Sequence, residues 1–156
     1  MAGVLLYKDM EKIFNLNNIE QITNEIIREA KKVSHKTATI ITFSGELGAG
    51  KTTITKELAK QLGIKERVVS PTFVIMKIYN TKDSKFKKLI HIDAYRLDKS
   101  EELLRLGWEE IISNKDNLIV VEWPERVSEC FPFDIISLKL EHIDDNTRTI
   151  KFCYNS

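Results

Sequence analysis

Apolar residues recur along the chain with two different periods, and each period predicts a different kind of element. Where they return every third or fourth residue, the pattern predicts helices over residues 18–32 and 51–62, the second of which is expected to end at Gly63. Weaker spacing predicts one or two short helices within residues 100–113, interrupted at Gly107. A side-chain cap is expected at the start of the first helix. The candidates for the cap and for its partner are Asn17, Asn18, Glu20 and Gln21.

Short apolar runs and alternating apolar residues predict the strands. The dense runs 38–43 and 118–121 are typical of buried strands, and alternation on both sides of the turn at residues 144–146 predicts a hairpin. The hairpin residues are Ile136, Leu138, Leu140, Ile150, Phe152 and Tyr154, and further strands are expected at residues 12–16, 73–79 and 89–92. Strand–helix–strand units therefore mix with sequential strand pairs. We expect an α/β fold with parallel central strands, antiparallel edge strands and flanking helices.

Composition and charge narrow the class of protein. At 156 residues, the chain is expected to form a single domain over residues 1–156. Its 24 Lys and Arg against 23 Asp and Glu give a net charge of +1, which argues against coating nucleic acid by charge alone. Cys130 and Cys153 stand in no metal-like spacing, no apolar run approaches the roughly 20 residues of a membrane helix, and residues 1–10 show no signal-peptide pattern. These features predict a cytoplasmic protein with no membrane contact.

The most informative segment is rich in glycine and lies between a predicted strand and a predicted helix. Its pattern, Gly-x-x-x-x-Gly-Lys-Thr, is that of a phosphate-binding loop (P-loop, Walker A motif). Glycines let several backbone N–H groups face one anion, and the helix N-terminus adds its positive dipole end. Lys51 would place a charge on the β- and γ-phosphates, and the Thr52 hydroxyl suits Mg²⁺. We expect ATP and Mg²⁺ to bind at Gly45, Glu46, Leu47, Gly48, Ala49, Gly50, Lys51 and Thr52.

Other residues are candidates to complete this site. Asp93 and Glu122 each follow a buried apolar strand, where ligands of such sheets gather, and the pattern alone does not rank them as metal partners. Thr72 could sense the γ-phosphate, although Ser-Pro-Thr is more often a plain turn into a strand. Trp123 could contact the base, although a core position is commoner for tryptophan. Arg96 could stabilise phosphate charge, although surface ion pairs are commoner.

Four segments taken together carry a family resemblance. They are Gly45-Glu46-Leu47-Gly48-Ala49-Gly50-Lys51-Thr52-Thr53, Ser70-Pro71-Thr72-Phe73, His91-Ile92-Asp93-Ala94-Tyr95-Arg96-Leu97 and Val121-Glu122-Trp123-Pro124-Glu125. In this order and spacing they resemble the bacterial TsaE family, the ATPase component of tRNA N6-threonylcarbamoyladenosine (t6A) biosynthesis. The phosphate loop alone is shared by many families, whereas its combination with the other segments is specific. The resemblance runs from about residue 44 to residue 126.

The resemblance implies a role for each matching residue. Asp93 would contact the metal through water or orient the attacking water, and Thr72 would belong to a switch-like segment. At the position of Glu46 the family commonly has aspartate, and glutamate keeps the negative charge. The expected catalytic residues are Lys51, Thr72, Asp93 and Glu122; the nucleotide-binding residues are those at positions 45–53, Thr53 included, with Trp123; the metal ligands are Thr52 and Glu122.

The implied function is ATP hydrolysis, expected to be weak without partners, that supports turnover of a TsaB–TsaD complex. TsaD transfers the threonylcarbamoyl group, so this chain would meet tRNA only through the complex. A small-molecule kinase stays the alternative, although no arginine-rich lid stands out. A GTPase-like switch lacks its guanine-reading motif, because Asn114-Lys115-Asp116-Asn117 has the wrong spacing and precedes a strand. The basic cluster Lys82, Lys85, Lys87 and Lys88 is interpreted as a solvated loop rather than a tRNA surface.

Overall fold

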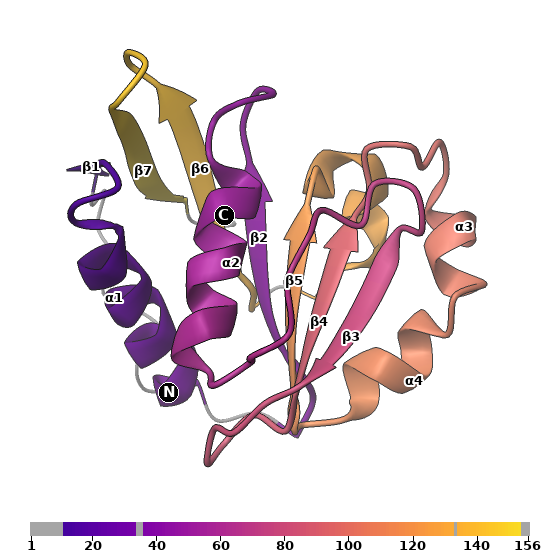
Figure 1. The fold of residues 1–156 in the computed structure, drawn as a ribbon. Coiled ribbons are helices and arrows are strands. Elements are labelled where there is room, and N and C mark those ends of the chain that lie inside the picture. Colours follow the sequence, from indigo (N-terminus) through magenta and orange to yellow (C-terminus); the bar gives the residue numbers. More distant parts are fainter. Residues whose placement is uncertain (1–10, 34–35, 133, 154–156) are drawn as a thin grey trace.

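A mixed sheet of seven strands runs through the part of the chain that the structure, a computed structural model, describes: residues 11–33, 36–132 and 134–153 (Figure 1). The strands are β1 Glu11–Phe14, β2 Thr39–Ser44, β3 Met76–Asn80, β4 Lys88–Asp93, β5 Asn117–Glu122, β6 Ile136–His142 and β7 Arg148–Cys153. Their order across the sheet is β1-β7-β6-β2-β5-β4-β3. Neighbours among β6, β2, β5 and β4 pair in parallel, while β7 and β1 continue one edge and β3 the other in antiparallel pairing. The predicted arrangement is confirmed.

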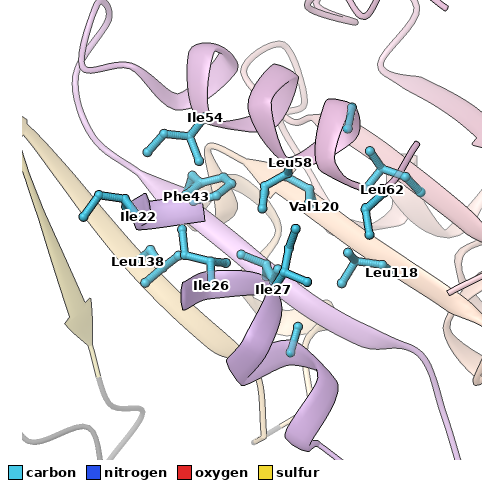
Figure 2. Close-up of a cluster of buried hydrophobic side chains, with 14 of the residues drawn as sticks. Ile22, Ile26, Ile27, Phe43, Ile54, Leu58, Leu62, Leu118, Val120 and Leu138 are labelled. Carbon is cyan, nitrogen blue, oxygen red and sulfur yellow. The ribbon is translucent and has the colours of Figure 1, made fainter. Parts of the chain in front are cut away.

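Helices cover both faces of this sheet. They are α1 Ile19–Lys32 and α2 Lys51–Gln61 on one face, with α3 Ser100–Leu104, α4 Trp108–Ser113 and the 3₁₀ helix η1 Pro124–Cys130 on the other (Figure 1). Figure 2 shows side chains of α1 and α2, such as Ile26 and Leu58, packed over Phe43, Val120 and other strand residues. Burial of this apolar surface is the main stabilising contribution to the fold. Among the described residues, no helix is long and apolar enough to cross a bilayer.

The central strands are apolar at nearly every position because both of their faces are covered. In β5, Leu118 and Val120 join the core under α1 and α2, whereas Ile119 and Val121 join the core under α3 and α4. Side chains of a strand alternate between the two faces, so the next residue, Glu122, returns to the α2 face. The alternation thus places the terminal carboxylate of β5 beside the beginning of α2.

Two local predictions are wrong. The strand expected at residues 73–79 begins only at Met76, because the preceding residues form a turn in which Phe73 is 81% exposed and Ile75 has a φ of 68°. The side-chain cap of α1 is also absent: Asn18 is the N-cap residue, but its side chain bonds the turn after β1 instead. The interruption of the helices at Gly107, where φ is 87°, is confirmed, and Tyr154 lies outside the described residues.

Candidate functional site

The glycine-rich loop leaves β2 and enters α2 at the carboxyl end of the parallel strands. Gly45 has a φ of 145°, and a Cβ there would clash with the carbonyl oxygen of Leu140, so the position requires glycine. Gly50 is the N-cap of α2 and makes no side-chain capping bond. Backbone N–H groups of the first helical turn therefore lack a side-chain acceptor, which is the geometry that binds anions.

Lys51 is almost fully buried beside this loop, with an exposed fraction of 5%. Its Nζ donates hydrogen bonds to the carbonyl oxygens of Gly45 and Glu46 and lies 4.0 Å from the ring centroid of Trp123. Burial lowers the pKa of Lys51, while nearby carboxylates, Glu122 foremost, oppose that shift. The loop thus holds a partly desolvated amine next to the uncapped helix N-terminus, where a phosphate oxygen could replace its carbonyl partners.

Glu122 ends β5 directly opposite the loop and is 2% exposed. Its Oε1 accepts a hydrogen bond of 2.9 Å from the Thr52 hydroxyl, and its Oε2 lies 2.5 Å from Nε2 of His91. A buried carboxylate is stable only when such donors surround it. The sheet therefore brings together Thr52 and Glu122, the two residues that the sequence proposed as metal ligands.

Asp93 ends β4 and pairs in register with Glu122 on the neighbouring strand. Its Oδ2 accepts hydrogen bonds from the hydroxyls of Thr72, at 2.7 Å, and Ser70, at 3.2 Å, and its Oδ1 accepts one from the backbone N–H of Tyr95. The two carboxylates thus lie side by side at the carboxyl ends of β4 and β5 but contact different segments. Glu122 bonds α2, whereas Asp93 bonds the turn that precedes β3.

Backbone strain accompanies both carboxylates. Among the described residues, the non-glycine positions with positive φ are Ile75 at 68° and Trp123 at 58°. Trp123 directly follows Glu122, and the carbonyl of Ile75 accepts a 2.9 Å hydrogen bond from the N–H of Asp93. Such strain persists only where the surrounding structure over-determines it, and it clusters at functional sites. The half-buried Trp123 ring packs on Lys51 and Tyr95, which places it at the carboxylate end of the site.

One cleft of about 830 Å³ joins these groups to a second region. Residues 47–53 line its middle, whereas Gly45 and Glu46 at the start of the loop do not line it, and Thr72, Asp93, Glu122 and Trp123 lie on the β5–β4 side. The opposite, β6–β7–β1 side is lined by residues 14–17 and by Asp145, Asn146 and Arg148. Nε of Arg148 donates a 3.1 Å hydrogen bond to the carbonyl of Gly48. Arg96 is not among the cleft-lining residues, and its guanidinium lies 4.4 Å from the ring centroid of Phe73.

Sequence reasoning gave no role to His91 or Arg148. A signal for His91 existed: it is the one polar residue inside the apolar run Leu89-Ile90-His91-Ile92, two positions before Asp93 and hence on the same face. No local signal marks Arg148, whose contact with Gly48 spans 100 positions of the chain.

The fold and cleft define an α/β protein in which a glycine-rich strand–helix turn, a buried lysine and two buried carboxylates share one site. The family model for threonylcarbamoyl adenosine biosynthesis protein TsaE matches residues 15–150, so the chain belongs to the TsaE family. It is 36% identical over 142 residues to the tRNA threonylcarbamoyladenosine biosynthesis protein TsaE of Rickettsia felis, covering 90% of this chain and 79% of the relative. The Bacillus subtilis TsaE is 38% identical over 118 residues, covering 75% and 70%.

The fold of this chain also resembles that of a solved structure. The crystal structure of Bacillus subtilis YdiB superimposes with a TM-score of 0.68 at 29% identity, covering 95% of this chain and 86% of that one. The resemblance expected from the four motif segments is therefore confirmed, and it extends beyond them to most of the described sheet.

Proposed function

We propose that this chain binds ATP with Mg²⁺ in the cleft and hydrolyses it in the service of t6A biosynthesis. Membership of the TsaE family gives the chain a role in that modification. The observation that carries the ATPase proposal is the meeting of three features in one cleft: the uncapped N-terminus of α2, the Lys51 amine, and the Thr52–Glu122 pair. A helix N-terminus and a lysine both favour phosphate, and the adjacent hydroxyl–carboxylate pair favours a hard cation.

The donor set fits magnesium. Mg²⁺ usually takes one or two protein oxygens and completes its shell with water and phosphate oxygens. Thr52 Oγ1 and Glu122 Oε1 lie 2.9 Å apart and offer such a pair, and no group of three or more His, Cys, Asp or Glu within the described ranges forms an all-protein metal cage. Thr52 and Glu122 would hold the ion, which offsets phosphate charge when it is bound.

Hydrolysis would use the remaining charged groups of the cleft. Lys51 would exchange its carbonyl partners for β- and γ-phosphate oxygens, and the N–H groups of the loop would hold the same phosphates. Asp93 is the remaining buried carboxylate at this edge, and its bond to the Thr72 hydroxyl fixes its orientation. It would orient the attacking water, or contact the metal through one, and Thr72 would respond to the γ-phosphate.

The position of the nucleoside follows from the phosphate end. The γ-phosphate belongs near Lys51 and the carboxylates, so the nucleoside would extend to the opposite side of the loop, toward residues 14–17 and Arg148. Leu16 and Leu47 line that part of the cleft and are 77% and 73% exposed. They are apolar surfaces that a base could cover. Trp123 lies instead against the Lys51 amine, so its contact with the base remains only a prediction.

Within the t6A machinery, we propose that hydrolysis supports turnover of a TsaB–TsaD complex and that tRNA is met through that complex. The test reconstitutes t6A formation from this chain, its TsaB and TsaD partners, tRNA and ATP. We expect the isolated chain to hydrolyse ATP slowly and in a Mg²⁺-dependent manner, and to hydrolyse it faster with its partners. We expect the TsaB–TsaD complex to form t6A over multiple turnovers only when the chain is present. In a competition assay, we expect the chain to bind ATP more tightly than GTP. Absence of ATP binding would contradict the proposal.

The kinase alternative has no structural observation in its favour. Among the described residues that line the cleft, Arg148 is the one arginine, and its guanidinium already bonds the carbonyls of Gly48, Asp144 and Thr147. Phosphate transfer from ATP to a small metabolite, with no release of inorganic phosphate, would nevertheless replace the ATPase proposal by this one.

A further inference from the structure

His91 lies buried beside the Glu122 carboxylate, and the proposed hydrolysis gives it no role. Its side chain is 0% exposed. Nε2 lies 2.5 Å from Oε2 of Glu122, and Nδ1 is buried without a hydrogen-bond partner in the described structure. Leu89, Ile90 and Ile92 fill the other inner positions of β4. Burying a polar ring with one nitrogen unpaired costs free energy, and such a group in a native structure calls for an explanation.

The contact geometry indicates which ring atom donates. Nε2 of His91 is the ring atom within hydrogen-bond distance of Glu122, and a carboxylate oxygen accepts, so Nε2 carries the donated proton. Glu122 then receives two donors: the Thr52 hydroxyl and the Nε2–H of His91.

Sheet geometry makes this contact rigid. His91 pairs in register with Val120, so it lies one diagonal step from Glu122, and the two side chains share the α2 face of neighbouring central strands. The Thr52 hydroxyl lies 2.9 Å from Oε1 and 3.2 Å from Oε2. A carboxylate that lost its second partner could rotate and present either oxygen to the loop.

We propose that His91 is a positioning residue: by donating Nε2–H to Oε2, it fixes the Glu122 carboxylate so that Oε1 faces Thr52 and the Mg²⁺ that the two would share. This inference rests on the proposed function, because it assigns His91 to that metal site. Partners behind metal ligands typically change metal affinity by about 10- to 100-fold when they are removed.

The test measures binding without turnover. Affinity for a non-hydrolysable ATP analogue is determined by calorimetry across a Mg²⁺ titration and again with chelator, for the wild-type chain, His91→Leu and His91→Gln. We expect His91→Leu to raise the Mg²⁺ midpoint by about 10-fold or more and to leave metal-free affinity unchanged. His91→Gln, whose amide can still donate, should recover most of the midpoint. In a Glu122→Gln background, His91→Leu should add nothing.

Several results would overturn the inference. An unchanged midpoint in a folded His91→Leu chain, an equal loss of metal-free affinity, or full additivity with Glu122→Gln would each make His91 a packing residue only. If His91→Leu does not fold, His91→Phe, which keeps an aromatic ring but has no donor, replaces it with the same expected and contradicting results. A wild-type chain that binds no nucleotide at all would instead refute the proposed function, so the two failures are distinguishable.

Discussion

On the β5–β4 side of the cleft the carboxylates are buried and hydrogen-bonded, whereas much of the lining on the β6–β7–β1 side is exposed. Asp93 is 4% and Glu122 2% exposed, and each accepts at least two hydrogen bonds. Across the loop, Leu16 is 77% exposed and the hairpin residues Asp145 and Asn146 are also exposed. One side is therefore a fixed array of charges, and the other is a surface that nothing in the described structure covers.

The difference indicates that the two sides of the cleft contribute to different steps, one to catalysis and the other to nucleotide affinity. Preorganised groups in a low-dielectric site stabilise developing charge without reorganising, so the carboxylate side suits the chemical step and the metal. An open apolar and polar rim contributes contact area, so the hairpin side suits nucleoside affinity. If this division is correct, substitutions on the first side change turnover or metal dependence, and those on the second change affinity alone.

The largest effect is expected at Lys51, which serves the centre of the cleft. Lys51→Ala removes a charged donor to the phosphates, a loss of about 1.5–3 kcal/mol, or roughly 10- to 150-fold in ATP affinity. Turnover should fall below detection. Lys60→Ala, an exposed lysine in the last turn of the same helix, is the matched control and should change neither. Wild-type affinity and turnover in Lys51→Ala would refute the phosphate-binding role of the loop.

A large effect on turnover alone is expected at Asp93. Asp93→Asn keeps the shape but removes the charge, and turnover at saturating ATP should fall by about 100-fold or more, the usual contribution of a positioned carboxylate. ATP affinity should change by less than about threefold. The Mg²⁺ dependence then separates the two roles left open for Asp93: an unchanged midpoint indicates water orientation, and a raised one indicates a metal contact. Unimpaired turnover would exclude both.

The next effect concerns the metal. Glu122→Gln should raise the Mg²⁺ concentration for half-maximal activity by about 10- to 100-fold and alter metal-free nucleotide binding little, because it removes the charged ligand. Glu129→Gln removes an exposed carboxylate seven residues on and is the control. An unaltered Mg²⁺ dependence in Glu122→Gln would move the metal role to Asp93.

The two sides of the cleft also differ in how far the sequence predicted them. The carboxylate side was predictable because its residues follow dense apolar runs, and such runs identify buried parallel strands and their ends. The pattern could not rank Asp93 and Glu122, since their partners depend on how β4 and β5 pair with each other and on where α2 starts. The hydrogen bond between His91 and Glu122 depends on the same register and was not predicted.

The hairpin side was predicted as structure but not as part of the site. Alternating apolar residues predicted β6 and β7. Nothing in the local sequence, however, indicates that Arg148 bonds Gly48, 100 positions away in the chain. Local rules also failed at two turns: Asn18 bonds the turn after β1 instead of capping α1, and the apolar Phe73 and Val74 lie exposed in a turn. In the first case a competing local hydrogen bond replaced the cap, and in the second the apolar residues were taken as part of a strand that begins only at Met76.

A small effect confined to affinity is expected on the hairpin side. Arg148→Ala removes the bond to Gly48 and a cleft-lining side chain, so ATP affinity should fall by about 2- to 10-fold, the value of a half-exposed hydrogen bond. Turnover at saturating ATP should match the wild type. Lys151→Ala, exposed on the same strand, is the control. A loss of turnover with unchanged affinity would contradict the division between the two sides.

The smallest effect is expected in the basic cluster Lys82, Lys85, Lys87 and Lys88, which lies on neither side of the cleft. Lys85 is structurally engaged, because its Nζ donates a 2.8 Å hydrogen bond to the carbonyl of Lys31 at the end of α1. The remaining Lys82, Lys87 and Lys88 are exposed. Replacing these three by alanine should leave ATP binding and turnover unchanged and should weaken the tRNA affinity, which is itself expected to be low, only slightly.

Filter binding of tRNA at two salt concentrations checks this last prediction. Each phosphate contact that matters contributes a slope of roughly −0.7 to −0.9 in the logarithm of affinity against the logarithm of salt, so the triple variant would flatten the slope by at most about three such increments. Because the net charge is only +1, we expect the isolated chain to bind weakly and without sequence preference. Tight, salt-resistant binding would mean that the chain contacts tRNA directly instead of through a complex.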